Sequence, residues 1–157
     1  MSRYKAIDIA RWFFYKNELA KNSEGAEDMT LLKLLKLLYY AEGSSLALGK
    51  GSLFSENIEA WEHGPVVPAV WRSQEDPYNL SFESEDIQKS LNNISEDDKA
   101  LLNEVYDVFG QYSAWGLRNK THEERPWIEA TENGRVLNRT ISRKTMEEYF
   151  KENYVSE

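Results

Sequence analysis

Two histidines with glutamate neighbours are the residues of this chain best suited to chemistry. His63 lies in the segment Trp61-Glu62-His63-Gly64-Pro65, and His122 lies in Thr121-His122-Glu123-Glu124. Imidazole and carboxylate groups can together bind a metal ion or transfer a proton. A metal site that uses both histidines with one of the neighbouring glutamates is therefore one hypothesis for this sequence.

Little else in the sequence supports a metal site or an enzyme. The two histidines are far apart, and neither a His-Glu-x-x-His nor a Gly-x-Ser-x-Gly motif occurs. Gly49-Lys50-Gly51-Ser52 lacks the spacing of a phosphate-binding loop, and the chain has no cysteine. We therefore expect no enzymatic activity, no metal and no cofactor. The alternative role of each imidazole is to fix a turn by hydrogen bonding to backbone or carboxylate groups.

The two histidine segments are also rich in tryptophan and proline. Pro65 and Pro68 fix φ and lack a backbone donor, and Gly64 tolerates angles that other residues resist, so we expect a rigid turn at Gly64-Pro65. Aromatic side chains beside such a turn are either core residues or hot spots of a binding surface. The candidate partner-binding residues are Trp61, His63, Gly64, Pro65, Val66, Trp71, His122, Pro126 and Trp127.

Charge and hydrophobicity narrow the class of protein. The chain has 41% hydrophobic and 29% charged residues, which are values of a globular protein. Its net charge of −8 argues against a nucleic-acid partner and leaves room for a basic protein partner, although it could simply maintain solubility. The acidic run from Glu75 to Asp86 could steer such a partner or be an ordinary solvated loop. We find no apolar run of about 20 residues and no signal peptide, and we expect a cytoplasmic protein without a membrane partner.

Hydrophobic periodicity predicts helices in the first half of the chain. One amphipathic helix is expected over about 6–21, and a leucine-rich helix capped by Thr30 is expected to run to about Leu48. Because the second helix is apolar nearly all round, we expect it to be central and buried. A short strand pair is an option within 54–61, followed by a short helix over 66–73 that is entered through Pro65.

Capping residues and turns organise the second half. Residues 74–85 read as a surface loop. We expect three further helices, with Ser95, Ser113 and Ser142 as N-caps, and a short helix opened by Pro126. Together these elements predict a mainly α fold, a compact single-domain helical bundle around the central leucine-rich helix with a possible small β-hairpin. The domain spans 1–157, with a core over about 6–130 and a C-terminal helix over about 142–154.

Several of these segments, in this order, resemble the Panacea domain, the SocA-like antitoxin family, which is also described as phage-associated. The resemblance covers about 6–130, and its more specific elements are Ala-Trp-x-x-Gly-Pro-Val and Thr-His-x-x-x-Pro-Trp. The segments are Leu38-Tyr39-Tyr40-Ala41-Glu42-Gly43, Leu53-Phe54, Ile58 through Pro68, Thr121-His122 and Pro126-Trp127.

The resemblance implies an antitoxin that neutralises a co-encoded toxin by direct contact. It leaves two alternatives open: a proteolytic adaptor that delivers a toxin to a ClpXP-type protease, or a phage-associated interaction protein without a toxin partner. Some members carry an extra DNA-binding domain, for which this acidic chain has no spare length. The family pattern marks Trp61, His63, Gly64, Pro65, Val66, His122, Pro126 and Trp127 without saying whether they bind the toxin or hold the fold.

Overall fold

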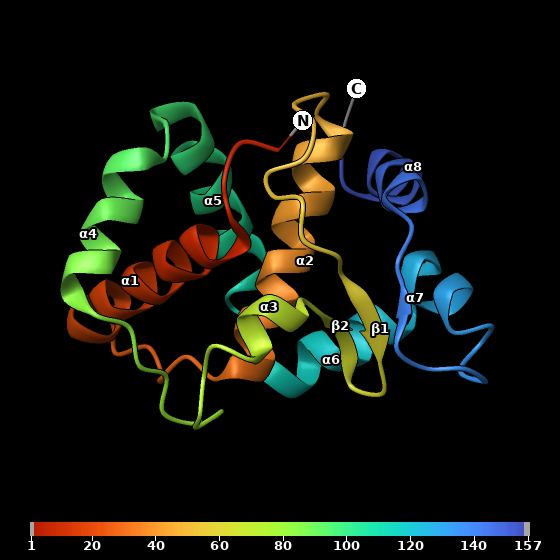
Figure 1. Ribbon diagram of the computed structural model, residues 1–157, viewed down its shortest axis with the longest axis horizontal. Coiled ribbons are helices and arrows are strands. Elements are labelled where there is room, and N and C mark those ends of the chain that lie inside the picture. Colours follow the sequence, from red (N-terminus) through yellow and green to blue (C-terminus); the bar gives the residue numbers. More distant parts are fainter. Residues whose placement is uncertain (1, 156–157) are drawn as a thin grey trace.

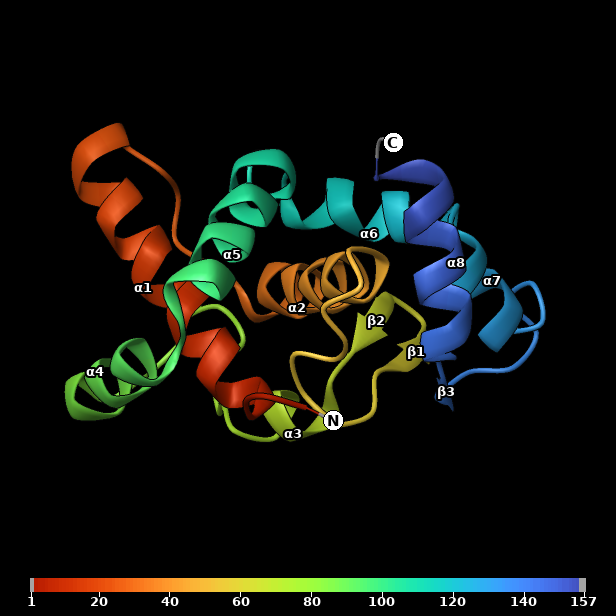
Figure 2. The same ribbon diagram turned by 90° about the horizontal axis from the view of Figure 1, so that it is seen from above.

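One helix, α2 (Leu31–Ala47), lies at the centre of the computed structural model, which describes residues 2–155. The Thr30 hydroxyl accepts a 3.3 Å hydrogen bond from the Lys33 amide and caps its first turn. Fourteen of its seventeen residues are buried. Figures 1 and 2 show α2 in orange between two groups of helices. The leucine-rich segment is therefore the core helix, as the sequence predicts.

The first group of helices contains α1 (Ala6–Glu24), α3 (Pro68–Trp71), α4 (Ser84–Asn93) and α5 (Glu96–Phe109). α1 packs on α4 along one side of the molecule, and α5 packs directly on α2. The Ser95 hydroxyl caps α5 by accepting from the Asp98 amide at 3.2 Å. Three acidic residues follow it in the first turn, where the helix dipole favours negative charge.

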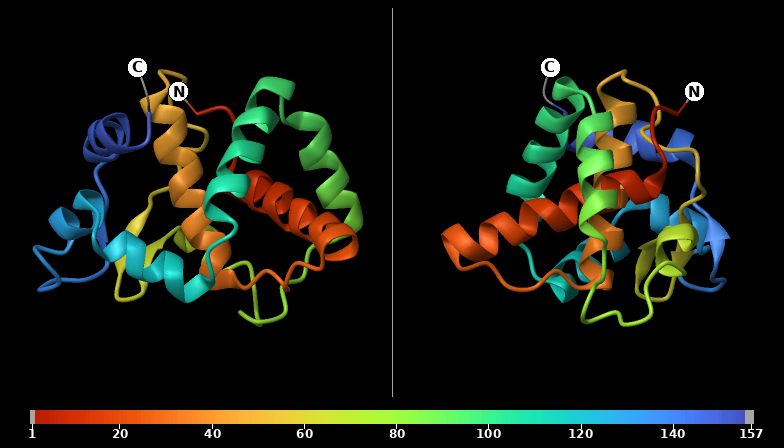
Figure 3. Two further views of the ribbon diagram at one scale, coloured as in Figure 1. Left: turned by 180° about the vertical axis from the view of Figure 1, so that it is seen from behind. Right: turned by 60° about the vertical axis from the view of Figure 1, so that its left-hand side comes forward.

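The second group contains α6 (Ala114–His122), α7 (Arg125–Ala130) and α8 (Arg143–Asn153). Viewed from behind in Figure 3, α6 crosses near the lower end of α2. α8 packs against the other end of α2, where a Cβ on Gly43 would lie only 2.4 Å from the ring of Phe150. A glycine at position 43 is what lets these two helices approach so closely.

A three-stranded antiparallel sheet lies beside the second group. β1 (Glu59–Trp61) is central and pairs with β2 (Gly64–Val66) and with β3 (Arg139–Thr140). Trp61 pairs with Gly64, so Glu62 and His63 form the turn between β1 and β2. We call β1, β2 and this turn the hairpin.

The buried carboxylate of Glu42 is paired with a cation, as the cost of an isolated buried charge requires. Glu42 on α2 is fully buried and accepts from the Leu53 amide at 2.8 Å and from Nε of Arg143 at 2.7 Å. Arg143 begins α8 and also donates to the Phe54 carbonyl at 2.9 Å. Through these bonds α8 is fastened to α2 and to the segment that leads to the hairpin.

The mainly helical fold with a small hairpin is confirmed, and five details of the expectation are wrong. Of the strand pair expected within 54–61, only β1 lies there, and β2 follows at Gly64–Val66. Gly64 and Pro65 belong to β2, and the turn lies one step earlier at Glu62 and His63. The short helix α3 is entered through Pro68 rather than Pro65. The expected 74–85 loop ends where α4 begins at Ser84, and the strand β3 was not expected. Within 2–155, no helix is long and apolar enough to cross a membrane.

Candidate functional site

The two segments singled out by the sequence meet behind the hairpin. The indole nitrogen of Trp127 on α7 donates to the Trp61 carbonyl at 2.9 Å. The Nε2 atom of His122, at the end of α6, lies 2.6 Å from the Glu62 carbonyl oxygen. Both contacts join a ring from the second segment to the backbone of the first, so the two segments form one structural unit.

His122 acts as a connector between helix and hairpin. Its Nδ1 atom lies 2.6 Å from the Arg118 carbonyl, one helical turn back, and its ring packs on Trp127 with 4.0 Å between ring centroids. Carbonyl oxygens only accept, so both contacts are hydrogen bonds when each ring nitrogen carries a proton. The imidazole fixes a turn through the backbone, which is the second role considered for it above.

An apolar groove of about 610 Å³ lies along the hairpin, lined in part by Trp61, His63 and Val66. Grooves of this size are typical of sites that take up a ligand or a partner's side chains. The side chains of Trp71, Tyr78 and Leu137 on its rim are 41%, 74% and 43% exposed. The groove is lined by Thr30, Leu32, Leu35, Lys36, Trp61, Glu62, His63, Val66, Trp71, Pro77, Tyr78, Ala114, Leu137 and Asn138.

The structure divides the nine candidate residues into two groups. One group lines the groove: Trp61, His63, Val66 and Trp71. The other group supports the hairpin from within or behind: Gly64, Pro65, His122, Pro126 and Trp127, all of them buried except the half-buried His122. The first group is able to touch a partner, and the second holds the groove wall in place. That any of them binds a partner stays a prediction.

Lys36 is a groove residue that the sequence reasoning did not select. Its side chain is fully buried, and Nζ donates to the Pro65 carbonyl at 3.1 Å. Burial, with a smaller contribution from the nearby Arg118 cation, lowers the pKa of Lys36 to about 7. The signal was present in the sequence, because Lys36 interrupts a run of leucines in a helix expected to be buried on most sides.

Glu124 organises the region where α7 begins. Its buried carboxylate accepts hydrogen bonds from the hydroxyls of Tyr39 at 2.9 Å, Tyr40 at 3.1 Å and Tyr154. Burial raises the pKa of Glu124, and these tyrosine donors partly oppose that shift. The carboxylate of Glu124 is therefore hydrogen-bonded to tyrosines, and both ring nitrogens of His122 contact backbone carbonyls. Among residues 2–155, no three histidine, aspartate or glutamate side chains gather as a metal-binding group.

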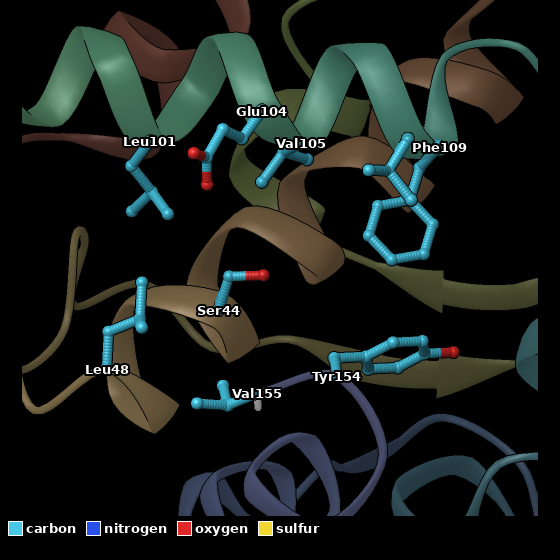
Figure 4. A pocket seen from close by; sticks show the side chains of 9 residues that line it. Ser44, Leu48, Leu101, Glu104, Val105, Phe109, Tyr154 and Val155 are labelled. Atoms are coloured by element: carbon cyan, nitrogen blue, oxygen red, sulfur yellow. The ribbon is translucent and has the colours of Figure 1, made fainter. Parts of the chain in front are cut away.

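A second and smaller hollow, of about 250 Å³, lies between α2, α5 and the residues after α8. In Figure 4, Leu101, Val105 and Phe109 of α5 point toward Tyr154 and toward Leu48, the residue that follows α2. Leu48 and the neighbouring Val108 are 48% and 50% exposed. None of the nine candidate residues lines this hollow.

The protein is small and mainly helical, and a large apolar groove opens on its surface. Residues 34–128 match the family described as "Antitoxin SocA-like, Panacea domain". The match covers more than half of the chain, and the chain therefore belongs to this family. The matched stretch begins within α2 and ends within α7, so it includes the hairpin but neither α1 nor α8. Comparisons with curated proteins and with solved structures gave no match.

Proposed function

We propose that this protein is an antitoxin that neutralises a toxin encoded beside it through direct contact at the apolar groove. The family supports an antitoxin role. The observation that carries the choice of surface is the groove itself, whose rim exposes Trp71, Tyr78 and Leu137. Exposed aromatic side chains around a hollow are typical of binding hot spots, and burying them against a partner is favourable. The proposal includes no catalytic step, metal or cofactor.

A growth-rescue experiment tests this function. Each protein encoded beside this chain is expressed with and without it, and we expect one of them to stop growth unless the chain is present. Failure to rescue growth from every neighbour, with the chain shown to be folded and abundant, would contradict the antitoxin role. It would shift support to a phage-associated interaction protein without a toxin partner.

Paired variants test the surface. The double variant Trp71→Ala/Tyr78→Ala removes two rim side chains, and Tyr15→Ala/Leu19→Ala removes two exposed side chains from α1, outside the groove. We expect the first variant to lose rescue and co-purification with the toxin, and the second to retain both. Full rescue by the groove variant would place the contact elsewhere on the molecule.

The second hollow supports an alternative, a proteolytic adaptor. An adaptor needs one surface for the toxin and another for the protease, and the hollow at Leu48 and Val108 is a second apolar feature with exposed side chains. This function predicts that the toxin is degraded faster when the chain is present and a ClpXP-type protease is active. A toxin half-life that does not change when the chain is deleted rules it out.

A further inference from the structure

Two cations at or near the groove, Lys36 and Arg118, lack a negative partner among residues 2–155. The buried Nζ of Lys36 has one acceptor, the Pro65 carbonyl, although an ammonium carries three donors. The Nε atom of Arg118 on α6 is shielded from solvent and has no hydrogen-bond partner. Among the salt bridges of residues 2–155, none involves Lys36 or Arg118. Arg118 is only half-buried, and its Nη1 donates to Asn119 at 3.1 Å, but Lys36 is fully buried. Buried cations are normally paired, so an ammonium with a single carbonyl acceptor is unusual for a structural role alone.

Lys36 lines the groove, and Arg118 lies near Lys36 although it is not itself a lining residue. The Arg118 guanidinium packs on the ring of Trp115 at 4.5 Å. The Trp115 ring is in turn 5.9 Å from the ring of His63, another lining residue. The rest of the lining is mostly aliphatic or aromatic. A ligand in this groove would therefore meet mostly apolar walls, together with the Lys36 amine and the exposed Glu62 carboxylate, which forms no ion pair with Lys36 within residues 2–155.

We propose that the groove takes an amphipathic segment of the partner protein, whose apolar side chains surround one aspartate or glutamate that pairs with Lys36 and Arg118. This inference rests on the proposed function and names the chemistry of the contact. The carboxylate accepts the donors that Lys36 and Arg118 leave unused, and it offsets the repulsion between the two cations. The net charge of −8 steers the partner as a whole, whereas this local pair selects the residue that enters the groove.

Protonation of Lys36 supports the same contact. Burial lowers the pKa of this lysine to about 7 in the free protein, so near neutral pH the amine is only partly charged. A carboxylate beside it favours the ammonium form. Binding is then accompanied by proton uptake, which calorimetry detects as a binding enthalpy that depends on the ionisation enthalpy of the buffer.

A small probe tests the chemistry without the partner. Phenylacetate carries an apolar ring and a carboxylate, and phenylacetamide is its neutral counterpart. In a titration followed by NMR, we expect phenylacetate to shift the indole signals of Trp61 and Trp71 and to bind about tenfold more tightly than the amide, as one charge-assisted hydrogen bond provides. Lys36→Met should abolish this preference. Lys33→Met, on the same helix but outside the groove lining, should retain it.

The pH dependence of the wild-type protein gives an independent test should Lys36→Met fail to fold. Phenylacetate is ionised at both about pH 6 and about pH 9, because ordinary carboxyl groups titrate near pH 4. Lys36 changes charge between these pH values, so we expect the preference for phenylacetate to be lost at the higher pH. The other ionisable groups near Lys36 are Glu62 and His63 in the groove lining and Arg118 beside it, and His63→Gln should show the same pH dependence.

The outcomes separate this inference from the proposed function. Equal binding of the two probes, or a preference that survives in folded Lys36→Met, overturns the inference. Loss of growth rescue in Trp71→Ala/Tyr78→Ala with full rescue by Lys36→Met also overturns it but leaves the groove as the toxin-binding surface. If binding depends on the C-terminal carboxylate of the partner and on none of its acidic side chains, the assignment to aspartate or glutamate is wrong. The inference is supported if substitution of one acidic partner residue weakens binding to the wild-type chain, and if that partner variant binds Lys36→Met no more weakly than it binds the wild type.

Discussion

Gly64 lies directly against Lys36: a Cβ atom placed on Gly64 would be 2.7 Å from Cε of Lys36 and 2.8 Å from Oγ1 of Thr121. Gly64 also has φ of +112°, a value that other residues rarely adopt. We expect Gly64→Ala to lower the free energy of unfolding by about 2–4 kcal/mol, from backbone strain and overpacking together. Gly51→Ala is the control, because φ is +79° there but the space is open. Equal losses in a urea titration would show that close packing at Gly64 contributes nothing.

Trp127 provides a test of the support behind the hairpin. The side chain is 8% exposed and bonds to the Trp61 carbonyl, so Trp127→Ala should cost about 3–5 kcal/mol of stability. Trp115 is 55% exposed, and Trp115→Ala should change stability by only about 0.5 kcal/mol. Chemical denaturation of both variants measures the contrast. Similar small effects in the two variants would mean that Trp127 is a contact residue rather than a structural one.

Lys36 gives the stability of the protein a defined pH dependence. Its amine titrates near 10.5 in the unfolded chain and at about 7 in the folded protein. Between these values the unfolded chain holds more protons, so the lysine makes stability rise with pH; below about 7 the full cost of the buried charge is present. Lys36→Met removes this dependence. We expect the stability of the variant relative to wild type to fall by roughly 2 kcal/mol between about pH 7 and about pH 9. A constant difference would show that the amine is solvated.

Arg143 is the charge partner of a fully buried carboxylate. Arg143→Ala leaves Glu42 with its two amide donors but no cation, and we expect a loss of about 3–5 kcal/mol. The neighbouring Lys144 is exposed, and Lys144→Ala should have almost no effect. Thermal unfolding of the two variants provides the comparison. If the double variant Arg143→Leu/Glu42→Leu regains the stability that Arg143→Ala loses, apolar packing can replace the ion pair.

The sequence predicts best what is decided locally. The hydroxyls of Thr30, Ser95, Ser113 and Ser142 each accept a hydrogen bond from the amide three residues later. These four N-caps are predictable because each residue directly precedes a helical pattern of apolar residues. The leucine run likewise identifies the buried helix without any knowledge of its neighbours.

Features that depend on tertiary contacts were harder to predict. Pro65 suggests a turn because it cannot donate a backbone hydrogen bond, yet β2 is at the edge of the sheet, where proline is tolerated. The helix α4 was missed because its buried residue is Ser90 and its other apolar side chains are few. The groove combines residues of α2, the hairpin and the 74–83 segment, and no local pattern reports such a combination.

Because α8 lies near the C-terminal end of the sequence, it is made after the elements on which it packs. Protein synthesis proceeds from the N-terminus, so α2 and the hairpin leave the ribosome well before Arg143, Phe150 and Tyr154. Until then Glu42 has no cation, Glu124 lacks one of its three tyrosines, and the surface at Gly43 is uncovered. We therefore expect the end of α2 that α8 covers to stay exposed in the nascent chain until α8 has been made.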